Sequence, residues 1–234
     1  MIARPAPEMA KGSRLLGRRV LVTQSSMFMG PAVTDLFSAE GATVISDDRD
    51  LKPPAAASQL IAEAGQVDVL IINLAIDNPR ALAHETSDEE WALVYDTLVH
   101  PTYRLTRAVL PQMMARRSGK IIVVGSAAAL RGTARRSCYG SARGAQHSFV
   151  RSAAIEAAPH NVQINATGQI FVENPTYFPP EVLQSEALKQ RLRDVPAGRV
   201  STGGEAAAFL LYLAGPESDF ITGQVFAYAG GWVA

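Results

Sequence analysis

Cysteine, net charge and long apolar stretches are all scarce in this sequence. Its 234 residues include one cysteine, Cys138, so no disulfide can form within the chain, and a reducing compartment is expected. The 22 basic side chains balance the 22 acidic ones, which gives no electrostatic footprint for nucleic acid or an anionic membrane. No apolar run approaches the ~20 residues that span a bilayer. We therefore expect a cytoplasmic protein that acts on a small molecule and has neither nucleic-acid nor membrane partners.

The chain divides into a short tail and one domain. Residues 1–14 are rich in proline and alanine, show no periodicity and lack the apolar core of a secretion signal. We expect a flexible tail over 1–14 and a Rossmann-like catalytic domain over 15–234. In that domain short β-branched runs alternate with helical stretches, and no linker or repeat interrupts them. The alternation predicts an α/β fold, a single doubly wound domain with a parallel sheet of about six to seven strands.

Apolar runs and helical periodicity give the expected elements. The expected strands lie at 19–23, 43–46, 67–73, 120–125, 162–166 and 224–228. The expected helices lie at 32–40, 58–64, 87–117, 139–158, 181–193 and 205–213. Proline lacks the backbone donor of a helix interior, so the helix at 87–117 is expected to bend near Pro101 and end near Pro111.

Three polar side chains after the strand at 120–125 have a spacing that suits proton transfer. Ser126 lies at the carboxyl end of that strand, where open parallel sheets bind ligands. Tyr139 and Arg143 are separated by one helical turn and share a face. A fixed cation within ~4–6 Å favours the phenolate of a tyrosine, whose reference pKa is about 10. These residues can serve as orienting hydroxyl, base and activator, although each also has a purely structural interpretation as a cap, packing or solvated side chain.

From Gly17 to Trp232 the layout resembles the short-chain dehydrogenase/reductase superfamily. Asn73 ends the third expected strand, and Ser126 and Tyr139 have that superfamily's spacing. The segments 196–199, 218–224 and 230–231 resemble its C-terminal segments. The resemblance implies a Rossmann-like fold and, for most of its members, a nicotinamide cofactor.

Glycine is missing where a dinucleotide would need it. The three glycine positions of the first turn hold Gln24, Phe28 and Gly30, and Phe28 would stand where the pyrophosphate approaches the helix. Arg143 replaces the lysine that follows the tyrosine in the dehydrogenases. Asp47 argues the other way, because an acid at this place binds the adenosine ribose. We interpret Asp47 and Asp48 instead as a solvated pair, and no cofactor is expected.

These departures together resemble the halohydrin dehalogenases, a cofactor-free branch of the same fold with a Ser, Tyr and Arg triad. The segments that look most like the B-type members are 99–101, 125–129, 166–169 and 230–232. The resemblance implies that Tyr139 takes the proton of a haloalcohol, that Arg143 keeps Tyr139 acidic and that Ser126 holds the oxygen. The oxygen then displaces the halide on the adjacent carbon and forms an epoxide. The reverse reaction opens epoxides with halide, azide, cyanide or nitrite.

The same resemblance implies a halide site and a substrate pocket. The halide would lie against Phe28 and the loop residues Gln169, Phe171 and Val172, with backbone N–H groups and aromatic edges around it. The alternative is that both phenylalanines are core or interface aromatics. The pocket residues implied are Leu74, Ala75, Ala127, Leu130 and Phe178.

Two rival functions stay open at this point. One is an NAD(P)-dependent short-chain oxidoreductase with an atypical glycine turn, and the other is a catalytically silent binding protein on the same fold. No metal site is expected, because the four histidines lack ligand spacing. Arg135 and Arg136 are more typical of a solvated pair than of an anion clamp.

The resemblance also implies assembly. The superfamily packs its two long helices, here 87–117 and 139–158, against partner copies. We therefore expect a homotetramer or a homodimer.

Overall fold

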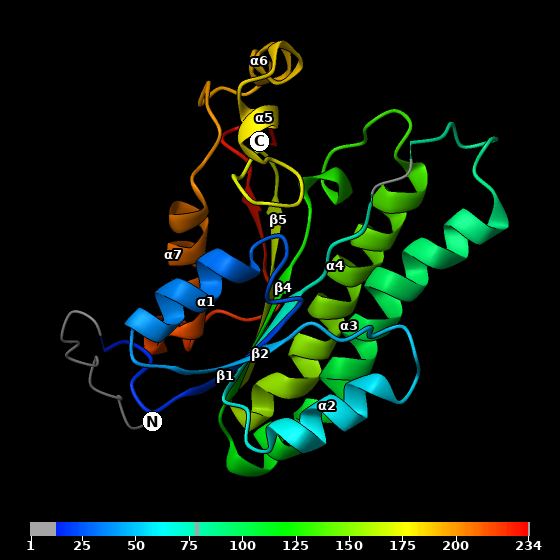
Figure 1. Cartoon of the computed structure of the whole chain (residues 1–234). Coiled ribbons are helices and arrows are strands. Elements are labelled where there is room, and N and C mark those ends of the chain that lie inside the picture. Colours follow the sequence, from blue (N-terminus) through cyan, green and yellow to red (C-terminus); the bar gives the residue numbers. More distant parts are fainter. Residues whose placement is uncertain (1–12, 78–79, 234) are drawn as a thin grey trace.

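The computed structural model describes residues 13–77 and 80–233, and these form a parallel sheet covered by helices on both faces (Figure 1). The described residues contain a six-stranded sheet in the order β2-β1-β3-β4-β5-β6. Its strands are β1 Arg19–Thr23, β2 Thr43–Asp47, β3 Val69–Asn73, β4 Gly119–Val124, β5 Val162–Gln169 and β6 Val225–Tyr228. All neighbouring strands pair in parallel. The single doubly wound Rossmann-like domain predicted from the sequence is confirmed.

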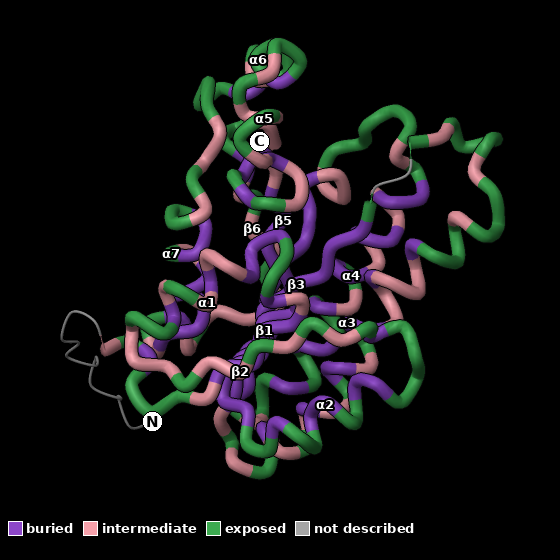
Figure 2. The backbone as a smooth tube through the Cα atoms, viewed as in Figure 1, coloured by how far each residue is buried: buried purple, intermediate pink, exposed green. Residues whose placement is uncertain are grey.

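Two layers of helices enclose the sheet. Figure 1 shows α1 and α7 on one face and α2, α3 and α4 on the other, with the short α5 and α6 beyond the carboxyl ends of the strands. The bounds are α1 Gly30–Ala39, α2 Ala56–Ala64, α3 Asp88–Arg116, α4 Ser137–Ala157, α5 Pro180–Leu183, α6 Glu186–Leu192 and α7 Gly203–Ala214. Because the strands are covered on both sides, the central strands are buried along their length (Figure 2).

Side chains alternate between two cores along each strand. Leu21 packs in the core under α2, α3 and α4, whereas its neighbours Val20 and Val22 pack under α1 and α7. Both faces of β1 therefore need apolar residues, and this explains its continuous apolar run from Val20 to Val22. Each fully buried side chain of this size contributes about 1.5–3 kcal/mol to folding.

Helix α3 corrects one expectation. It continues through Pro101 and Pro111 to Arg116 over 29 residues, so the expected end near Pro111 is wrong. Ser87 begins the helix, with its side chain accepting the backbone N–H of Glu90. Each internal proline costs about 3 kcal/mol. The apolar side of the helix is buried from Val94 to Met113, and this packing outweighs the local propensity.

The segment after β5 holds two short helices where one was expected over 181–193. The side chain of Ser185 accepts the N–H of Leu188 and begins α6 separately from α5. Strand β5 also extends three residues further than expected, to Gln169. This extension brings Gln169 to the edge of the sheet where the other functional candidates lie.

The expected tail falls largely on residues 1–12, which lie outside the described residues. At the boundary, the backbone N–H of Arg14 donates to the Glu40 carboxylate at 3.2 Å. Leu15 is buried in the core under α1. No helix in the described part of the chain has the length and apolar character needed to span a membrane.

Candidate functional site

The turn between β1 and α1 has the backbone conformation typical of glycine at two positions that hold other residues. Gln24 has a φ of 44° and Phe28 a φ of 50°, both in the left-handed region that favours glycine. The Asn73 amide at the end of β3 donates to the carbonyls of Gln24 and Met27 and so fixes the turn. Position 30 accepts only glycine, because a Cβ on Gly30 would lie 2.3 Å from the carbonyl oxygen of Ser25.

Phe28 is held in this conformation by the loop after β5. Its backbone N–H donates to the Thr176 hydroxyl at 2.7 Å, and its ring meets the Tyr177 ring edge-on with centroids 5.3 Å apart. The Tyr177 hydroxyl in turn hydrogen-bonds both the N–H and the carbonyl of Ile76 at 2.9 Å. Burial, and then the neighbouring Tyr139, raise the pKa of Tyr177 to about 12, so Tyr177 stays a neutral donor.

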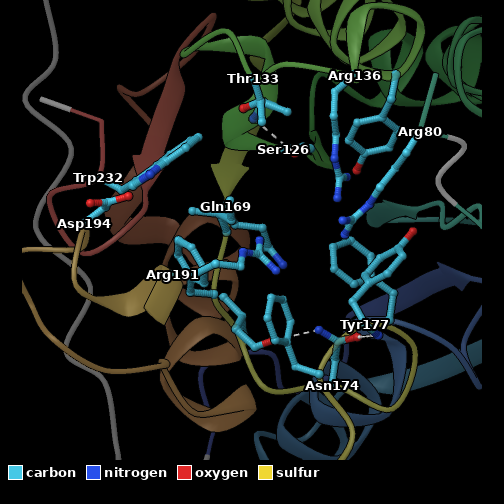
Figure 3. A pocket seen from close by; sticks show the side chains of 18 of the residues that line it. Arg80, Ser126, Thr133, Arg136, Gln169, Asn174, Tyr177, Arg191, Asp194 and Trp232 are labelled. Atoms are coloured by element: carbon cyan, nitrogen blue, oxygen red, sulfur yellow. Dashed lines mark hydrogen bonds between the residues drawn. The ribbon is translucent and has the colours of Figure 1, made fainter. Parts of the chain in front are cut away.

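A cavity of about 520 Å³ opens at the carboxyl ends of the strands, the location that open parallel sheets provide for ligands. Figure 3 shows side chains converging from the residue before α4, from the end of β5 and from the loop after β5, with Arg136, Gln169 and Tyr177 among them. The cavity brings together seven of the site residues expected from the sequence: Phe28, Ser126, Tyr139, Gln169, Phe171, Val172 and Phe178.

Arg143 lies beneath Tyr139 and is completely buried. Its Nε donates to the Tyr139 hydroxyl at 3.1 Å, which agrees with the shared helix face expected from the spacing. The other nitrogens donate to the carbonyls of Val124 and Leu74 and to Oε1 of Gln146, at 3.1, 2.7 and 3.0 Å. Within the described residues no carboxylate lies within 4 Å of this guanidinium. The phenol oxygen therefore contacts a buried, uncompensated positive charge.

Ser126 follows β4 and lines the cavity with a buried side chain. Its Oγ accepts the backbone N–H of Ala128 at 3.2 Å and caps the short 3-10 turn Ala127–Ala129. The serine thus has the structural role of a cap. Because that bond uses an oxygen lone pair, the hydroxyl proton stays available for a substrate oxygen.

Unpaired donors gather on the opposite wall of the cavity. Nε2 of Gln169 is buried and has no hydrogen-bond partner among the described residues. The backbone N–H groups of Phe171 and Val172 also donate to nothing in the described part of the chain, and Phe171 has a φ of 55°. Asn174 fixes the loop by accepting the N–H groups of Thr176 and Tyr177. Buried donors left unpaired in this way are rare and indicate a missing acceptor.

Four residues expected in the substrate pocket do not line this cavity: Leu74, Ala75, Ala127 and Leu130. Leu74 packs in the core under α2, α3 and α4, and its backbone carbonyl accepts a hydrogen bond from Arg143. Ala75 packs in the opposite core, and its N–H donates to the Gln24 side chain. Ala127 is fully buried, and Leu130 lies against Gly168. The side chains of Leu74 and Ala75 therefore point into the two cores and away from the cavity.

The cavity also contains residues that sequence reasoning did not assign to it, among them Arg80, Arg136, Asn174, Arg191 and Trp232. Asn174 precedes Pro175, a dipeptide that indicates a turn, and this was the available signal for an ordered loop. Nothing in the sequence pairs Arg80 or Arg191 with the site, because they come from distant segments.

The residues of the first turn do not fit a dinucleotide. The buried Phe28 ring and the Tyr177 ring against it occupy the place where bare backbone must meet a pyrophosphate. The Asp48 carboxylate accepts hydrogen bonds from the Ser25 hydroxyl and from the backbone N–H of Ser26, so it caps the turn. Asp47 pairs with Arg49 at 2.7 Å. The two acids are structural partners of neighbouring groups, and neither lines the cavity. In the described residues no group of three or more His, Cys, Asp or Glu side chains gathers as metal ligands.

Comparisons with known proteins identify the family. A family model described as Enoyl-(Acyl carrier protein) reductase matches residues 9–233. The chain belongs to the short-chain dehydrogenase/reductase superfamily. A curated relative, 3-oxoacyl-(acyl-carrier-protein) reductase FabG of Vibrio harveyi, is 31% identical over 93% of this chain and 98% of its own length. The protein of that name from Thermotoga maritima is 28% identical over 94% and 99%.

Solved structures with different names share this fold. A structure named "Dehalogenation enzyme" is 33% identical with a TM-score of 0.85, and the match covers 94% of this chain and 99% of that one. A 3-oxoacyl-(acyl-carrier protein) reductase with bound NAD from Brucella melitensis has a TM-score of 0.85 at 24% identity, covering 100% and 98%. The latter likeness shows the shared fold.

Proposed function

We propose that this protein is a cofactor-independent halohydrin dehalogenase, which converts vicinal haloalcohols into epoxides and halide. The observation that carries the proposal is Phe28, a buried aromatic ring in the dinucleotide turn that lines the same cavity as Tyr139. The Arg143–Tyr139 hydrogen bond supports it, as does the likeness to a solved structure named "Dehalogenation enzyme".

Tyr139 is the base in the proposed reaction. Its phenolate removes the proton of the substrate hydroxyl, while Ser126 donates a hydrogen bond to the same oxygen. The guanidinium of Arg143, 3.1 Å from the phenol oxygen, stabilises the phenolate. Arg143 stays protonated and cannot relay the proton, so the proton leaves Tyr139 through the cavity.

The deprotonated oxygen then attacks the adjacent carbon. The new carbon–oxygen bond closes the epoxide as the carbon–halogen bond breaks, and its electron pair leaves with the halide. Donors for the halide are Nε2 of Gln169 and the N–H groups of Phe171 and Val172, with the positive ring edges of the phenylalanines around them. In reverse, halide, azide, cyanide or nitrite opens an epoxide and Tyr139 returns the proton.

Chloride release from 1,3-dichloro-2-propanol tests this proposal in buffer without nicotinamide. The wild type should release chloride, and Tyr139→Phe should lower the rate by at least about 100-fold, because proton transfer by a positioned base contributes that much. Tyr212→Phe, a matched change on α7 outside the cavity, should keep the wild-type rate. Absence of release by the wild type, while a known dehalogenase releases chloride in the same assay, would reject the proposal.

The names of the curated relatives favour a second function, reduction of a carbonyl substrate with a nicotinamide cofactor. Titration with NADPH, followed by its fluorescence and by its oxidation with a 3-oxoacyl thioester, separates the two functions. Saturable binding with turnover supports the reductase and removes the blocking role given to Phe28. Folded protein that performs neither reaction supports a silent binding role.

We also propose that the protein assembles as a homodimer or homotetramer through α3 and α4. Exposed apolar side chains on these helices support this, with Tyr103 40% and Ile155 76% exposed. Light scattering after gel filtration measures the mass, and Ile155→Glu should reduce it. A monomeric wild type would contradict the proposal.

A further inference from the structure

Gln146 connects the proton-transfer pair to the neighbouring helix. It lies on α4 three residues beyond Arg143, on the helix face that carries Tyr139, and its side chain is buried. Its Oε1 accepts a hydrogen bond from Nη1 of Arg143 at 3.0 Å. Among the described residues, Tyr139 and Gln146 are the two whose side chains hydrogen-bond this guanidinium. Gln146 is therefore the side chain best placed to orient Arg143.

The other end of the Gln146 amide is fixed by α3. Its Nε2 donates to the Thr102 hydroxyl at 2.7 Å and to the Leu98 carbonyl at 2.8 Å. The Thr102 hydroxyl donates its own proton to the same carbonyl, so toward Gln146 it acts as an acceptor. The amide thus has its nitrogen toward α3 and its oxygen toward Arg143. Figure 1 shows α3 and α4 side by side, and hydrogen bonds run from α3 through Gln146 and Arg143 to the phenol oxygen.

Every hydrogen-bond acceptor of the Arg143 guanidinium is neutral. Two are the backbone carbonyls of Val124 and Leu74, and the others are the phenol of Tyr139 and the amide of Gln146. A fully buried arginine is typically paired with a carboxylate, and a glutamate at position 146 would supply one at the same side-chain length. Glutamine instead orients the guanidinium without neutralising it. The positive charge is left for the phenolate that the reaction requires.

The titratable neighbours of Arg143 do not neutralise it either. Burial, and then the charge of Arg143, lower the pKa of His147, the next residue of α4 after Gln146, to about 4. Burial raises the pKa of Tyr177, in the loop after β5, to about 12. Both side chains are therefore uncharged between these pH values. Arg136, whose guanidinium carbon lies 5.8 Å from the ring centroid of Tyr139, is positive as well.

We propose that Gln146 is a positioning residue, which holds the Arg143 guanidinium against the Tyr139 hydroxyl and leaves its charge uncompensated. Its part in catalysis rests on the proposed dehalogenase function. Gln146 does not line the cavity, so it acts through Arg143 and does not contact the substrate. The proton of the substrate hydroxyl passes to Tyr139 as described above, and Gln146 neither gains nor loses one. Its hydrogen bond and its neutrality have separate consequences, which two substitutions distinguish.

Gln146→Glu tests the neutrality. The carboxylate keeps an acceptor beside Arg143, and the Thr102 hydroxyl can turn to donate to its second oxygen, so the variant should fold. The added negative charge opposes the phenolate. The midpoint of the pH–rate profile for kcat/KM should therefore move upward by about 1 pH unit. Gln59→Glu, the same substitution at an exposed position of α2 outside the cavity, should leave the midpoint unchanged.

Gln146→Met tests the hydrogen bond. Methionine fills a similar volume without an acceptor or a charge, so Arg143 keeps its charge and loses one contact that orients it. The kcat for chloride release should fall by about 10-fold, because a hydrogen bond to a charged group contributes that much. The KM should stay at the wild-type value, since Gln146 does not contact the substrate. The pH midpoint should move less than half as far as in Gln146→Glu.

Ultraviolet absorbance of the phenolate measures the effect of the charge without turnover. Each protein is titrated from neutral to alkaline pH, and the curve of its Tyr139→Phe counterpart is subtracted, because the chain has six tyrosines. The remaining absorbance change reports Tyr139. Its midpoint should be about 1 pH unit higher in Gln146→Glu than in the wild type. Gln59→Glu should again match the wild type.

The outcomes are distinct. A wild-type midpoint in Gln146→Glu, or a shift of equal size in Gln146→Met, overturns the inference. If Gln146→Glu does not fold, Gln146→Met decides, because a wild-type kcat in that variant also overturns it. A shifted absorbance midpoint in a protein that releases no chloride keeps the role of Gln146 and rejects the dehalogenase proposal. Chloride release with wild-type midpoints and rates in both variants keeps the dehalogenase and rejects the role of Gln146.

Discussion

Replacing Phe28 with glycine and with alanine tests the left-handed turn directly. The φ of 50° costs a residue with a Cβ about 1–2 kcal/mol, and glycine avoids this cost. Loss of the buried ring removes about 3–5 kcal/mol from the free energy of unfolding in either variant, including the edge contact with Tyr177. Against this advantage, glycine loses more conformational freedom than alanine on folding, which lowers the stability of the glycine variant by about 0.5–1 kcal/mol.

These magnitudes predict an unusual order of stability. Phe28→Gly should be more stable than Phe28→Ala by about 0.5–1 kcal/mol, although both are less stable than the wild type. Phe37 provides the matched control, since it is fully buried in the helical backbone of α1. At position 37 the order reverses, and Phe37→Ala should be more stable than Phe37→Gly by about 1 kcal/mol because glycine is a poor helix former.

Urea unfolding of the four variants at one pH measures these differences. If Phe28→Ala equals or exceeds Phe28→Gly in stability, the turn does not impose the left-handed conformation and the argument about strain is wrong. The same proteins test the proposed function. Loss of the Phe28 ring should weaken the inhibition of epoxide formation by chloride. The Phe37 variants should keep wild-type inhibition wherever they stay folded.

Three further predictions follow from buried polar groups. Burial, and then the charge of Arg143, lower the pKa of His147 to about 4. Between pH 6.5 and 4 the unfolded chain therefore binds more protons than the folded one, and the free energy of unfolding should fall by up to about 3 kcal/mol as the pH drops through this window. Denaturation at several pH values should show a flatter dependence of this free energy on pH for His147→Gln than for the wild type. Gln169→Leu removes an unpaired buried N–H donor and only a long hydrogen bond from Thr167, 3.4 Å. Thermal melting should therefore show unchanged or higher stability, by up to about 1 kcal/mol, while the KM for halide in epoxide opening rises. Arg143→Lys cannot reproduce the hydrogen bonds to Leu74 and Val124, so urea unfolding should show a loss of about 1–3 kcal/mol.

Local spacing predicted the parts of the site that depend on one element. The period of a helix predicted that Tyr139 and Arg143 share a face, and their hydrogen bond agrees. The continuous apolar run of 121–124 predicted a buried strand, so Ser126 was correctly expected at the carboxyl edge of the sheet. In each case neighbouring residues contain the whole argument.

Tertiary packing decided what spacing could not. Helix α3 passes Pro111 because its apolar side is buried over many turns, and local rules for proline do not include that packing. Leu74 and Ala75 follow β3 as expected but turn toward opposite cores, since successive residues of an extended chain alternate in direction. Arg191 is 52 positions beyond Tyr139, and only the folded loop after β5 brings it to the cavity.

The first turn connects the fold to the proposed chemistry. A left-handed residue with a side chain costs about 1–2 kcal/mol where glycine would cost nothing, so phenylalanine persists at position 28 only if its ring contributes more than that. Burial of the ring contributes about 2–3 kcal/mol, and Thr176 fixes the same residue through its backbone. The ring occupies the turn that a pyrophosphate would need and forms a wall of the cavity beside Tyr139. In the proposed dehalogenase, Tyr139 and Arg143 provide the proton transfer beside this ring, and the cavity of about 520 Å³ receives a haloalcohol without a dinucleotide.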